Sequence, residues 1–251
     1  MKKPSRKPGQ RWRQQTSRPP RLSRQLSIVY EDDAVAILNK PAGLLSVPVE
    51  GSDAPSALSI LAAELKPRRQ RALVVHRIDR FTSGLLLFAK TDADRHILIR
   101  QFLAHTPVRQ YLAVVRGHVT PKSGTLVHHF RREEQFQQLS SAKDRKATRA
   151  ELSYTVEQSL RGATLVRATL LTGLQNQIRV QFLALGHPVV GDRKYAPAEA
   201  SETKISRVAL HAAHLEFIHP RTKETLVVDC DLAPDMASLV RALTPNRGDR
   251  T

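Results

Sequence analysis

Short apolar runs and helical patterns follow one another along this chain without strict alternation, and this order limits the possible fold more than any other feature. The first strand-like run, residues 34–38, lies between an acidic turn and the turn Pro41-Ala42-Gly43. The other strand-like runs are residues 85–89, 111–115, 164–171, 208–210 and 226–228. A doubly wound parallel sheet requires regular alternation of strands and helices, so the pattern predicts an α+β fold.

Four segments carry the apolar spacing of helices that pack against a core. Two sets fall at positions i, i+3, i+4 and i+7: Leu58, Leu61, Ala62 and Leu65, and then Met236, Leu239, Val240 and Leu243. A third helix is predicted from Asp92, as N-cap, through Leu103. The fourth surrounds Ile178 and Phe182 and ends near Gly186, which suits a left-handed C-cap. Residues 129–150 are highly charged without a clear period, and we expect an exposed excursion there.

Positive charge is concentrated at the N-terminus. The first 26 residues hold nine of the 40 Lys and Arg residues and none of the 23 acidic ones, so the rest keeps +8 of the formal charge of +17. Few apolar side chains occur there, and we expect residues 1–26 to form a disordered basic arm, followed by one folded domain over residues 27–245 and a flexible tail over 246–251. The charge favours a nucleic-acid partner through counterion release, although a cationic arm can also serve solubility alone.

Several classes of protein are disfavoured by what the sequence lacks. Cys230 is the single cysteine, which rules out an internal disulfide and a thiol-rich metal site. No apolar run reaches about 18 residues, and the N-terminus has no apolar stretch of the kind that secretion signals carry. His211 and His214 are three residues apart in a strand-like setting that does not suggest a metal. We expect a cytoplasmic protein without membrane, metal or cofactor.

The segment from His76 to Lys90, HRIDRFTSGLLLFAK, places one carboxylate among basic side chains. Asp79 lies in a polar loop directly before an apolar strand, where a rigid sheet can hold a reactive group at its edge. Arg77 and Arg80 flank it and favour its ionised form, which keeps a nucleophile available at neutral pH. From these residues alone, an ion-paired loop Asp is the more common alternative.

The sequence of this segment resembles the signature HRLDRxTSGLLLFAK of the RluA-type family of RNA pseudouridine synthases. Further stretches agree in content and order with that family: NKPAGL at 39–44, RQYLAVVRG at 109–117, QIRV at 177–180 and LGHPVVGD at 185–192. The resemblance covers about residues 28–235. It implies the pseudouridine synthase fold, a largely antiparallel mixed sheet flanked by helices with a central RNA-binding cleft, and makes residues 27–245 the catalytic domain.

The resemblance also implies an activity, the isomerisation of uridine in RNA to pseudouridine, and roles for three residues. Asp79 matches the essential carboxylate, which acts at the sugar or at the base. Tyr111 matches the tyrosine that packs against the target base and is implicated in removing the C5 proton. Arg179 matches the basic residue that pairs with the Asp. Read without the resemblance, Tyr111 fits a half-buried strand residue and Arg179 a surface charge.

Eight further residues belong to the expected substrate-binding set, and structured RNA is the expected partner. They are Lys40, His76, Arg77, Arg80, Thr82, Ser83, Gly84 and Gln177. The target base must leave its stack to react, and Arg77 is a candidate to occupy the vacated space. Ribosomal RNA and transfer RNA both remain open as substrates, and we expect the protein to act as a monomer.

One stretch departs from the family pattern. Where TGRxHQIR is usual, this chain reads TGLQNQIR, so Leu174 replaces an Arg and Asn176 replaces a His. Leu174 cannot bind a phosphate, and Asn176 cannot become a cation. This departure motivates an alternative, a non-catalytic RNA-binding or ribosome-assembly protein that retains the synthase fold. A glycosidic hydrolase is a third possibility, but it usually requires two carboxylates, and only Asp79 is marked.

Overall fold

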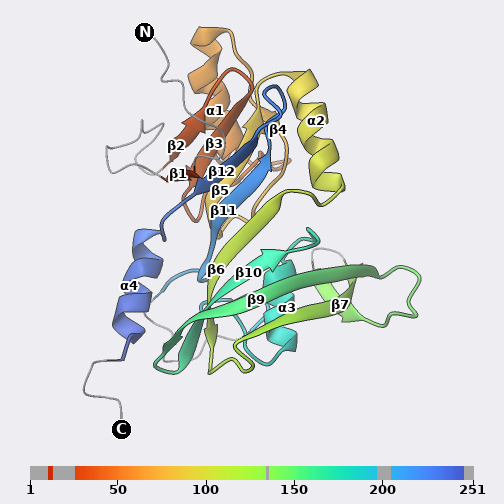
Figure 1. Cartoon of the computed structure of the whole chain (residues 1–251), viewed down its shortest axis with the longest axis vertical. Coiled ribbons are helices and arrows are strands. Elements are labelled where there is room, and N and C mark those ends of the chain that lie inside the picture. Colours follow the sequence, from red (N-terminus) through yellow and green to blue (C-terminus); the bar gives the residue numbers. More distant parts are fainter. Residues whose placement is uncertain (1–10, 14–25, 134–135, 197–204, 246–251) are drawn as a thin grey trace. The chain divides into compact units, whose positions relative to one another are not determined.

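The computed structural model describes residues 11–13, 26–133, 136–196 and 205–245, and these divide into two compact units (Figure 1). Unit 1 contains the residues up to Arg109 together with Ala212–Asp231, and unit 2 contains Gln110–His211 together with the residues from Leu232 onward. Both units combine strands with helices, and the predicted α+β class is confirmed. None of the helices in the described ranges is long and apolar enough to cross a membrane.

The boundary between the units falls inside two strands, β6 (Val108–Arg116) and β11 (Leu210–Ile218). The sequence was expected to form one domain over residues 27–245, because no segment of it resembles a linker. A boundary that runs through continuous strands requires no Pro-rich or Gly-rich connection, so composition gives no sign of it.

Unit 1 is built on a largely antiparallel group of strands. They are β2 (Ser27–Glu31), β3 (Val35–Lys40), β4 (Leu73–Val74), β5 (Ser83–Ala89), β11 and β12 (Thr225–Asp229). The order is β2-β3-β5-β11-β12, with β4 also paired to β5. β5 is buried along its whole length, as its run of apolar residues predicted.

Helix α1 (Ala57–Leu65) covers the strands of unit 1 and leads into a short 3₁₀ helix, η1 (Lys66–Arg68). Its buried residues Ala57, Leu61 and Leu65 join Leu38 and Phe88 in one apolar cluster, in agreement with the predicted spacing. Ser56 caps the helix by accepting a hydrogen bond from the Ser59 N–H over 3.0 Å.

Helix α2 (Asp92–Leu103) begins at Asp92, the residue predicted as its N-cap, so the actual N-cap lies one residue earlier than predicted. Thr91 is the cap, because its Oγ1 accepts a hydrogen bond from the Asp94 N–H over 3.1 Å. Asp92 and Asp94 instead lie in the first turn, where their negative charge interacts favourably with the helix dipole. The prediction was wrong in the cap because Thr and Asp are both good N-caps and stand side by side.

Two parts of the expected basic arm lie among the described residues. Arg11–Arg13 forms β1, which pairs in parallel with β12, and Leu26 is fully buried in the core of unit 1. The disorder of the arm stays a prediction, and the remainder of the arm lies outside the described residues, as does the tail 246–251. A strand at a sheet edge offers unpaired backbone groups, which can bind a segment that lacks an apolar pattern of its own.

Unit 2 contains a second antiparallel group of strands in the order β6-β10-β9-β7-β8 (Figure 1). The strands that follow β6 are β7 (Ser123–Glu133), β8 (Phe136–Ser140), β9 (Thr148–Leu160) and β10 (Ala163–Leu170). Much of the segment 129–150 is therefore strand and was not predicted as such. Its side chains are mostly exposed, as expected, and this exposure removes the apolar alternation that would have marked the strands.

Helices α3 (Gln177–Ala184) and α4 (Pro234–Leu243) complete unit 2. Ile178 and Phe182 of α3 and Met236 and Leu239 of α4 join one apolar cluster with residues of β6, β9 and β10. Gly186 follows α3 with a φ of +84°, which agrees with the predicted left-handed cap.

The strand expected at 208–210 is β11, which runs from Leu210 to Ile218. The apolar run marked only its first residue. The rest of the strand was not recognised, because His211 and His214 are buried polar side chains that interrupt an otherwise apolar run.

Candidate active site

Asp79 lies in the loop between β4 and β5 of unit 1. The backbone N–H of Thr82 donates a hydrogen bond to the carbonyl of Asp79 over 3.1 Å, which closes a turn over residues 79–82. The buried strand β5 follows directly, so the turn is attached to a rigid element while the Asp79 side chain itself is half-buried. The predicted placement of Asp79, in a loop before an apolar strand, is confirmed.

Lys40, at the end of β3, fixes the backbone on one side of Asp79. Its side chain is fully buried, and Nζ donates hydrogen bonds to the carbonyls of Pro41 (3.0 Å), Leu44 (2.8 Å) and Arg80 (3.1 Å). The Gly43 N–H also donates to the Arg80 carbonyl over 2.8 Å. The ammonium group therefore holds the loop after β3 against the turn of Asp79, and burial keeps it from acting as a surface contact for phosphate.

Ser46 fixes the backbone on the other side of Asp79. Its hydroxyl donates to the Ile78 carbonyl over 2.7 Å and accepts from the Ile78 N–H over 3.2 Å. The Ser46 side chain is buried, as is Ile78. The residues before and after Asp79 are thus both held by the loop 40–46, and this restrains the direction in which the carboxylate points.

The two arginines beside Asp79 are exposed, and they differ in their contacts. Arg80 Nε donates to the Gly43 carbonyl over 2.9 Å, and its guanidinium lies 5.5 Å from the centroid of the Phe81 ring. Arg77 has neither a hydrogen bond nor an ion pair within the described part of the chain. Its guanidinium is therefore available to RNA, as its predicted role requires.

His76 has a structural environment. Its Nε2 accepts a hydrogen bond from the Leu87 N–H over 3.1 Å, and its ring stacks on Phe102 with centroids 4.7 Å apart. Burial, together with the positive charge of Arg109, lowers the pKa of His76 to about 3. The ring is neutral at physiological pH and supports β5 and α2, so its expected contact with substrate remains a prediction.

Gly84, at the start of β5, is required by packing. A Cβ atom at this position would lie 2.2 Å from the carbonyl oxygen of Ala212 on β11, and the φ of +107° disfavours any side chain. Thr82 and Ser83 beside it are buried. The Thr82 hydroxyl has no hydrogen-bond partner among the described residues. The expected substrate contacts of these three residues remain predictions, and Gly84 has a structural reason to be glycine.

Arg179, in the first turn of α3, is a buried cation in unit 2 rather than a surface charge. Its Nε and Nη2 donate to the two carboxylate oxygens of Asp192 over 2.7 and 2.6 Å, and its Nη1 donates to Asn176 Oδ1 over 2.7 Å. This bidentate geometry fixes the plane of the guanidinium.

Tyr111 lies on β6, opposite Ala168 of β10, and packs half-buried against the core of unit 2. Tyr111 and Arg179 belong to unit 2, whereas Asp79 belongs to unit 1. The proximity of the three therefore stays a prediction, as does the central cleft. Each of them is held by a well-defined local environment within its own unit.

The sequence from β3 to α3 matches a known family. A family model described as RNA pseudouridylate synthase matches residues 34–184. An uncharacterized RNA pseudouridine synthase of Bacillus subtilis, YlyB, is 35% identical over 226 residues, covering 88% of this chain and 74% of that protein. A dual-specificity RNA pseudouridine synthase RluA of Vibrio cholerae is 37% identical over 220 residues, with coverage of 84% and 85%. The chain belongs to the RluA-type RNA pseudouridine synthases.

Two further comparisons agree with this membership. A ribosomal large subunit pseudouridine synthase D of Zymomonas mobilis is 33% identical over 230 residues, with coverage of 87% of this synthase and 73% of that protein. The solved structure of human RNA pseudouridylate synthase domain containing 1 superposes with a TM-score of 0.70 at 28% identity, covering 91% of both chains. The synthase catalyses the isomerisation of uridine in RNA to pseudouridine, and the non-catalytic alternative is not favoured.

Leu174, which replaces the Arg of the family pattern, has joined an apolar cluster of unit 2. It packs against Phe130, Ala150 and Val180. The synthase has therefore exchanged a potential phosphate contact for a packing contact at this position.

Asn176, which replaces the family His, links two side chains. Its Oδ1 accepts from Arg179 Nη1, and its Nδ2 donates to the Tyr195 hydroxyl over 3.1 Å. Its backbone is left-handed, with a φ of +56°, a conformation in which Asn and His are both enriched. Asn is therefore suited to this backbone conformation, and its amide provides one acceptor and one donor for the two hydrogen bonds.

Gln177 holds the loop in front of α3. Its Oε1 accepts from the Thr172 hydroxyl and the Leu174 N–H, and its Nε2 donates to the Glu151 carbonyl and to Gln181 Oε1, all within 3.0 Å. Both lone pairs and both amide hydrogens are engaged inside unit 2. These bonds indicate a structural role, and the expected contact of Gln177 with RNA is not supported by them.

The sequence analysis gave no role to Ser46, which restrains the turn of Asp79 in unit 1, or to Asp192, which holds Arg179 in unit 2. Asp192 ends the quoted stretch LGHPVVGD, so the motif marked it, but only the fold shows its ion pair with Arg179. Ser46 had no sequence signal, because a serine in a loop is commonplace. In the described ranges, no group of three or more His, Cys, Asp or Glu side chains could hold a metal.

Proposed function

We propose that this synthase modifies uridines in structured ribosomal RNA and that Asp79 is its essential carboxylate. The main support is the doubly restrained turn around Asp79, held by Lys40 on one side and by Ser46 on the other. A carboxylate that must act at one sugar or one base benefits from a fixed direction, because misplacement by about 1 Å costs around a hundredfold in rate.

The proposed reaction needs no redox step. The bond from N1 of uracil to C1′ of the ribose breaks, the base turns over within the site, and a bond forms between C5 and C1′. The proton that C5 then loses is removed at the base, and N1 gains one, so the product is an isomer of the substrate. Asp79 acts at the sugar or the base, Tyr111 packs against the base and assists in removing the C5 proton, and Arg179 pairs with Asp79.

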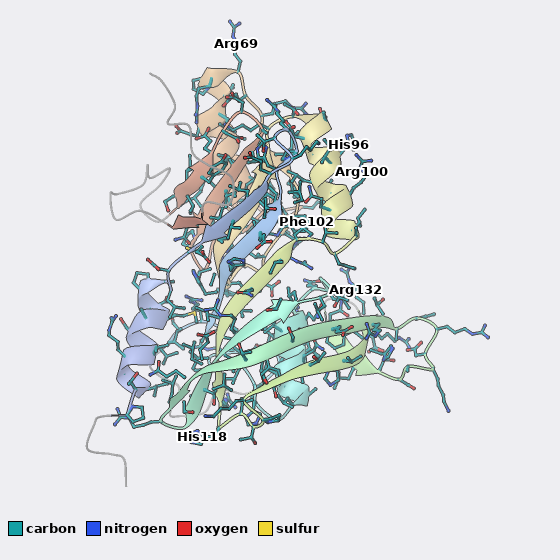
Figure 2. All side chains as sticks on the ribbon, viewed as in Figure 1. Arg69, His96, Arg100, Phe102, His118 and Arg132 are labelled. Atoms are coloured by element: carbon teal, nitrogen blue, oxygen red, sulfur yellow. The ribbon has the colours of Figure 1, made fainter. Side chains whose placement is uncertain are left out.

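RNA binding is proposed to rest on exposed basic side chains. Arg77 fills the space that the flipped base leaves. Arg69 projects from the end of η1, and His96 and Arg100 project from α2 (Figure 2). These three residues are exposed, and their side chains have no hydrogen bond or ion pair within the described ranges. Contacts of this kind bind phosphates with little sequence preference and weaken as salt rises.

Ribosomal RNA is proposed as the substrate because relatives of this synthase carry that RNA in their names. Transfer RNA is the competing substrate, which the experiment below distinguishes. We further propose that the enzyme is a cytoplasmic monomer that needs neither metal nor cofactor. Light scattering should then give a mass near 28.1 kDa, and a chelator should leave the activity intact. A dimer mass, or loss of activity in chelator, would contradict this part.

The test is to incubate the purified enzyme separately with ribosomal RNA and with transfer RNA, both from cells that lack it, and to map pseudouridine. New pseudouridine in ribosomal RNA is expected with the wild type and with Asp53→Asn, which changes an exposed carboxylate of the same unit. Asp79→Asn should give none while it still binds RNA. Modification of transfer RNA alone would contradict ribosomal RNA as the substrate. Turnover by Asp79→Asn near the wild-type level would contradict the proposed role of Asp79.

A further inference from the structure

Four side chains of unit 2 form a continuous row of cations and aromatic rings that begins at Arg179. The guanidinium of Arg179 lies 4.9 Å from the centroid of the Tyr195 ring. Lys194 Nζ lies 5.5 Å from the same centroid and 4.5 Å from that of Phe136. The rings of Phe136 and Tyr195 are nearly perpendicular, at 87°, with centroids 6.2 Å apart. The row leads from the buried cation of the site to strand β8.

The row is fastened to the same carboxylate that holds Arg179. Asp192 Oδ1 accepts hydrogen bonds from the Lys194 N–H over 3.0 Å and from the Tyr195 N–H over 3.2 Å. The Tyr195 hydroxyl accepts from Asn176 Nδ2 over 3.1 Å and from the Gln137 N–H, next to Phe136, over 3.2 Å. These bonds fix the position of Tyr195 and of the strand that carries Phe136.

The outer end of the row is exposed. Phe136 has 44% of its surface open to solvent, and Lys194 is exposed as well. A single exposed apolar residue is ordinary at a protein surface, as Leu139 on the same strand shows with 51%. Phe136 differs from Leu139 because it is an aromatic ring, with the Lys194 ammonium over it at 4.5 Å from the centroid. Nucleobases stack on aromatic rings and phosphates bind lysines, so this pair is complementary to a nucleotide.

We propose that Phe136 and Lys194 form a subsite for one unpaired nucleotide that flanks the target uridine, with its base against the Phe136 ring and its phosphate at Lys194. The inference rests on the proposed function, because it takes Arg179 as part of the active site. Since every base has a π face, the subsite accepts different bases and contributes affinity rather than strict sequence selection. Neither side chain acts on the reacting atoms, so the subsite lowers KM and leaves kcat unchanged.

The proposal is tested by combining protein variants with abasic RNA. RNA fragments that the wild type modifies are prepared with a single abasic nucleotide at each position near the target uridine. One flanking abasic position should raise the dissociation constant of the wild type by about five- to tenfold, the lower range for a base stacked on an aromatic ring. Phe136→Ala should raise the dissociation constant for intact RNA by a similar factor. The abasic fragment should cause no further rise in this variant.

Three variants serve as controls. Phe136→Tyr, which keeps the ring, should bind like the wild type. Phe136→Leu, which keeps an apolar side chain without the ring, should bind like Phe136→Ala. Leu139→Ala, a change at the other exposed apolar residue of β8, should leave the dissociation constant unchanged. The subsite would be overturned if Phe136→Leu bound RNA as tightly as the wild type. It would also be overturned if the losses of affinity from Phe136→Ala and from the abasic nucleotide added up at every position.

The result is separable from a failure of the proposed function. Binding is measured in an Asp79→Asn background. The dissociation constants of the Phe136 variants with intact and abasic RNA can therefore be compared whether or not Asp79 is the catalytic group. In the active enzyme, Phe136→Ala should raise KM five- to tenfold while kcat stays within twofold of the wild type. A fall in kcat at unchanged KM would show that Phe136 acts in the chemical step instead and would overturn the proposal.

Discussion

Lys40 donates a hydrogen bond to the backbone carbonyl of Arg80 from a position with no exposure to solvent. The two residues are forty positions apart, at the end of β3 and in the turn of Asp79. The bond connects the stretch NKPAGL with the stretch that carries Asp79, the proposed catalytic carboxylate. A buried ammonium is expensive to desolvate, and it persists where several acceptors satisfy it. Three carbonyls do so here.

The first prediction follows from this arrangement. Lys40→Met keeps the apolar stem and removes the charge, so the carbonyls of Pro41, Leu44 and Arg80 lose a donor in a buried setting. We expect the free energy of unfolding to fall by about 3 kcal/mol and the unfolding midpoint by about 6 °C or more. Calorimetry measures this change. Lys66→Met, at an exposed lysine of the same unit, should unfold like the wild type, and an equally stable Lys40→Met would contradict the role given to Lys40.

The second prediction concerns Gly84. In Gly84→Ala the new methyl carbon would meet the Ala212 carbonyl at 2.2 Å, a contact that only backbone movement relieves. Because β5 and β11 must separate, we expect a loss of more than about 4 kcal/mol, seen as insoluble or unfolded protein. Gly162→Ala, in a turn with positive φ but with no atom within 4 Å of the added carbon, should cost only about 1 kcal/mol. Equal stability of the two variants in urea unfolding would refute the packing argument.

These two residues show what the sequence could and could not predict. The stretches that contain Lys40 and Gly84 were found from their match to the family's sequence motifs, and so was the position of Asp79 before a buried strand. Their physical roles were not found, because a hydrogen bond across forty residues and the close approach of two strands arise only in the fold. Lys40 and Gly84 were assigned to RNA binding, and both have structural roles.

The elements that escaped prediction share one cause. The helices α1, α3 and α4 were predicted from apolar spacing. α1 and α4 each bury one face, whereas α3 buries six consecutive residues, polar ones included. The exposed strands β7, β8 and β9 bury little between 129 and 150, and the buried strand β11 carries histidines inside. In both cases the alternation of apolar and polar residues that marks a half-buried strand is missing. Arg179 was read as a possible surface charge for a similar reason, because its partner Asp192 lies beyond the helix.

The third prediction separates the side chain of Asn176 from its backbone. Asn176→Gly keeps the left-handed conformation and removes the hydrogen bonds to Arg179 and Tyr195, which should lower the free energy of unfolding by about 2 kcal/mol. Asn176→Ala also forces a Cβ atom into a positive φ and should lose about 1 kcal/mol more. Urea unfolding measures the order, and Gln175→Ala, at the exposed neighbour, should match the wild type. If Asn176→Ala were as stable as Asn176→Gly, the backbone argument would be wrong.

The fourth prediction is a pH dependence that originates at His76. Burial and the charge of Arg109 lower the pKa of His76 from 6.5 to about 3, so the folded protein binds this proton less readily than the unfolded chain does. The stability that the neutral ring provides is therefore complete above pH 6.5 and declines as the pH falls toward 3, by at most about 1.4 kcal/mol per pH unit.

His76→Gln tests this dependence, because a glutamine oxygen can still accept the hydrogen bond of the Leu87 N–H without titrating. We expect the variant to lose less stability than the wild type between pH 6.5 and pH 4.5, although it is less stable at pH 7.5 because the stacking on Phe102 is lost. Unfolding free energies at a series of pH values provide the comparison. Parallel curves for the wild type and His76→Gln would show that this histidine is protonated as easily in the folded state as in the unfolded chain.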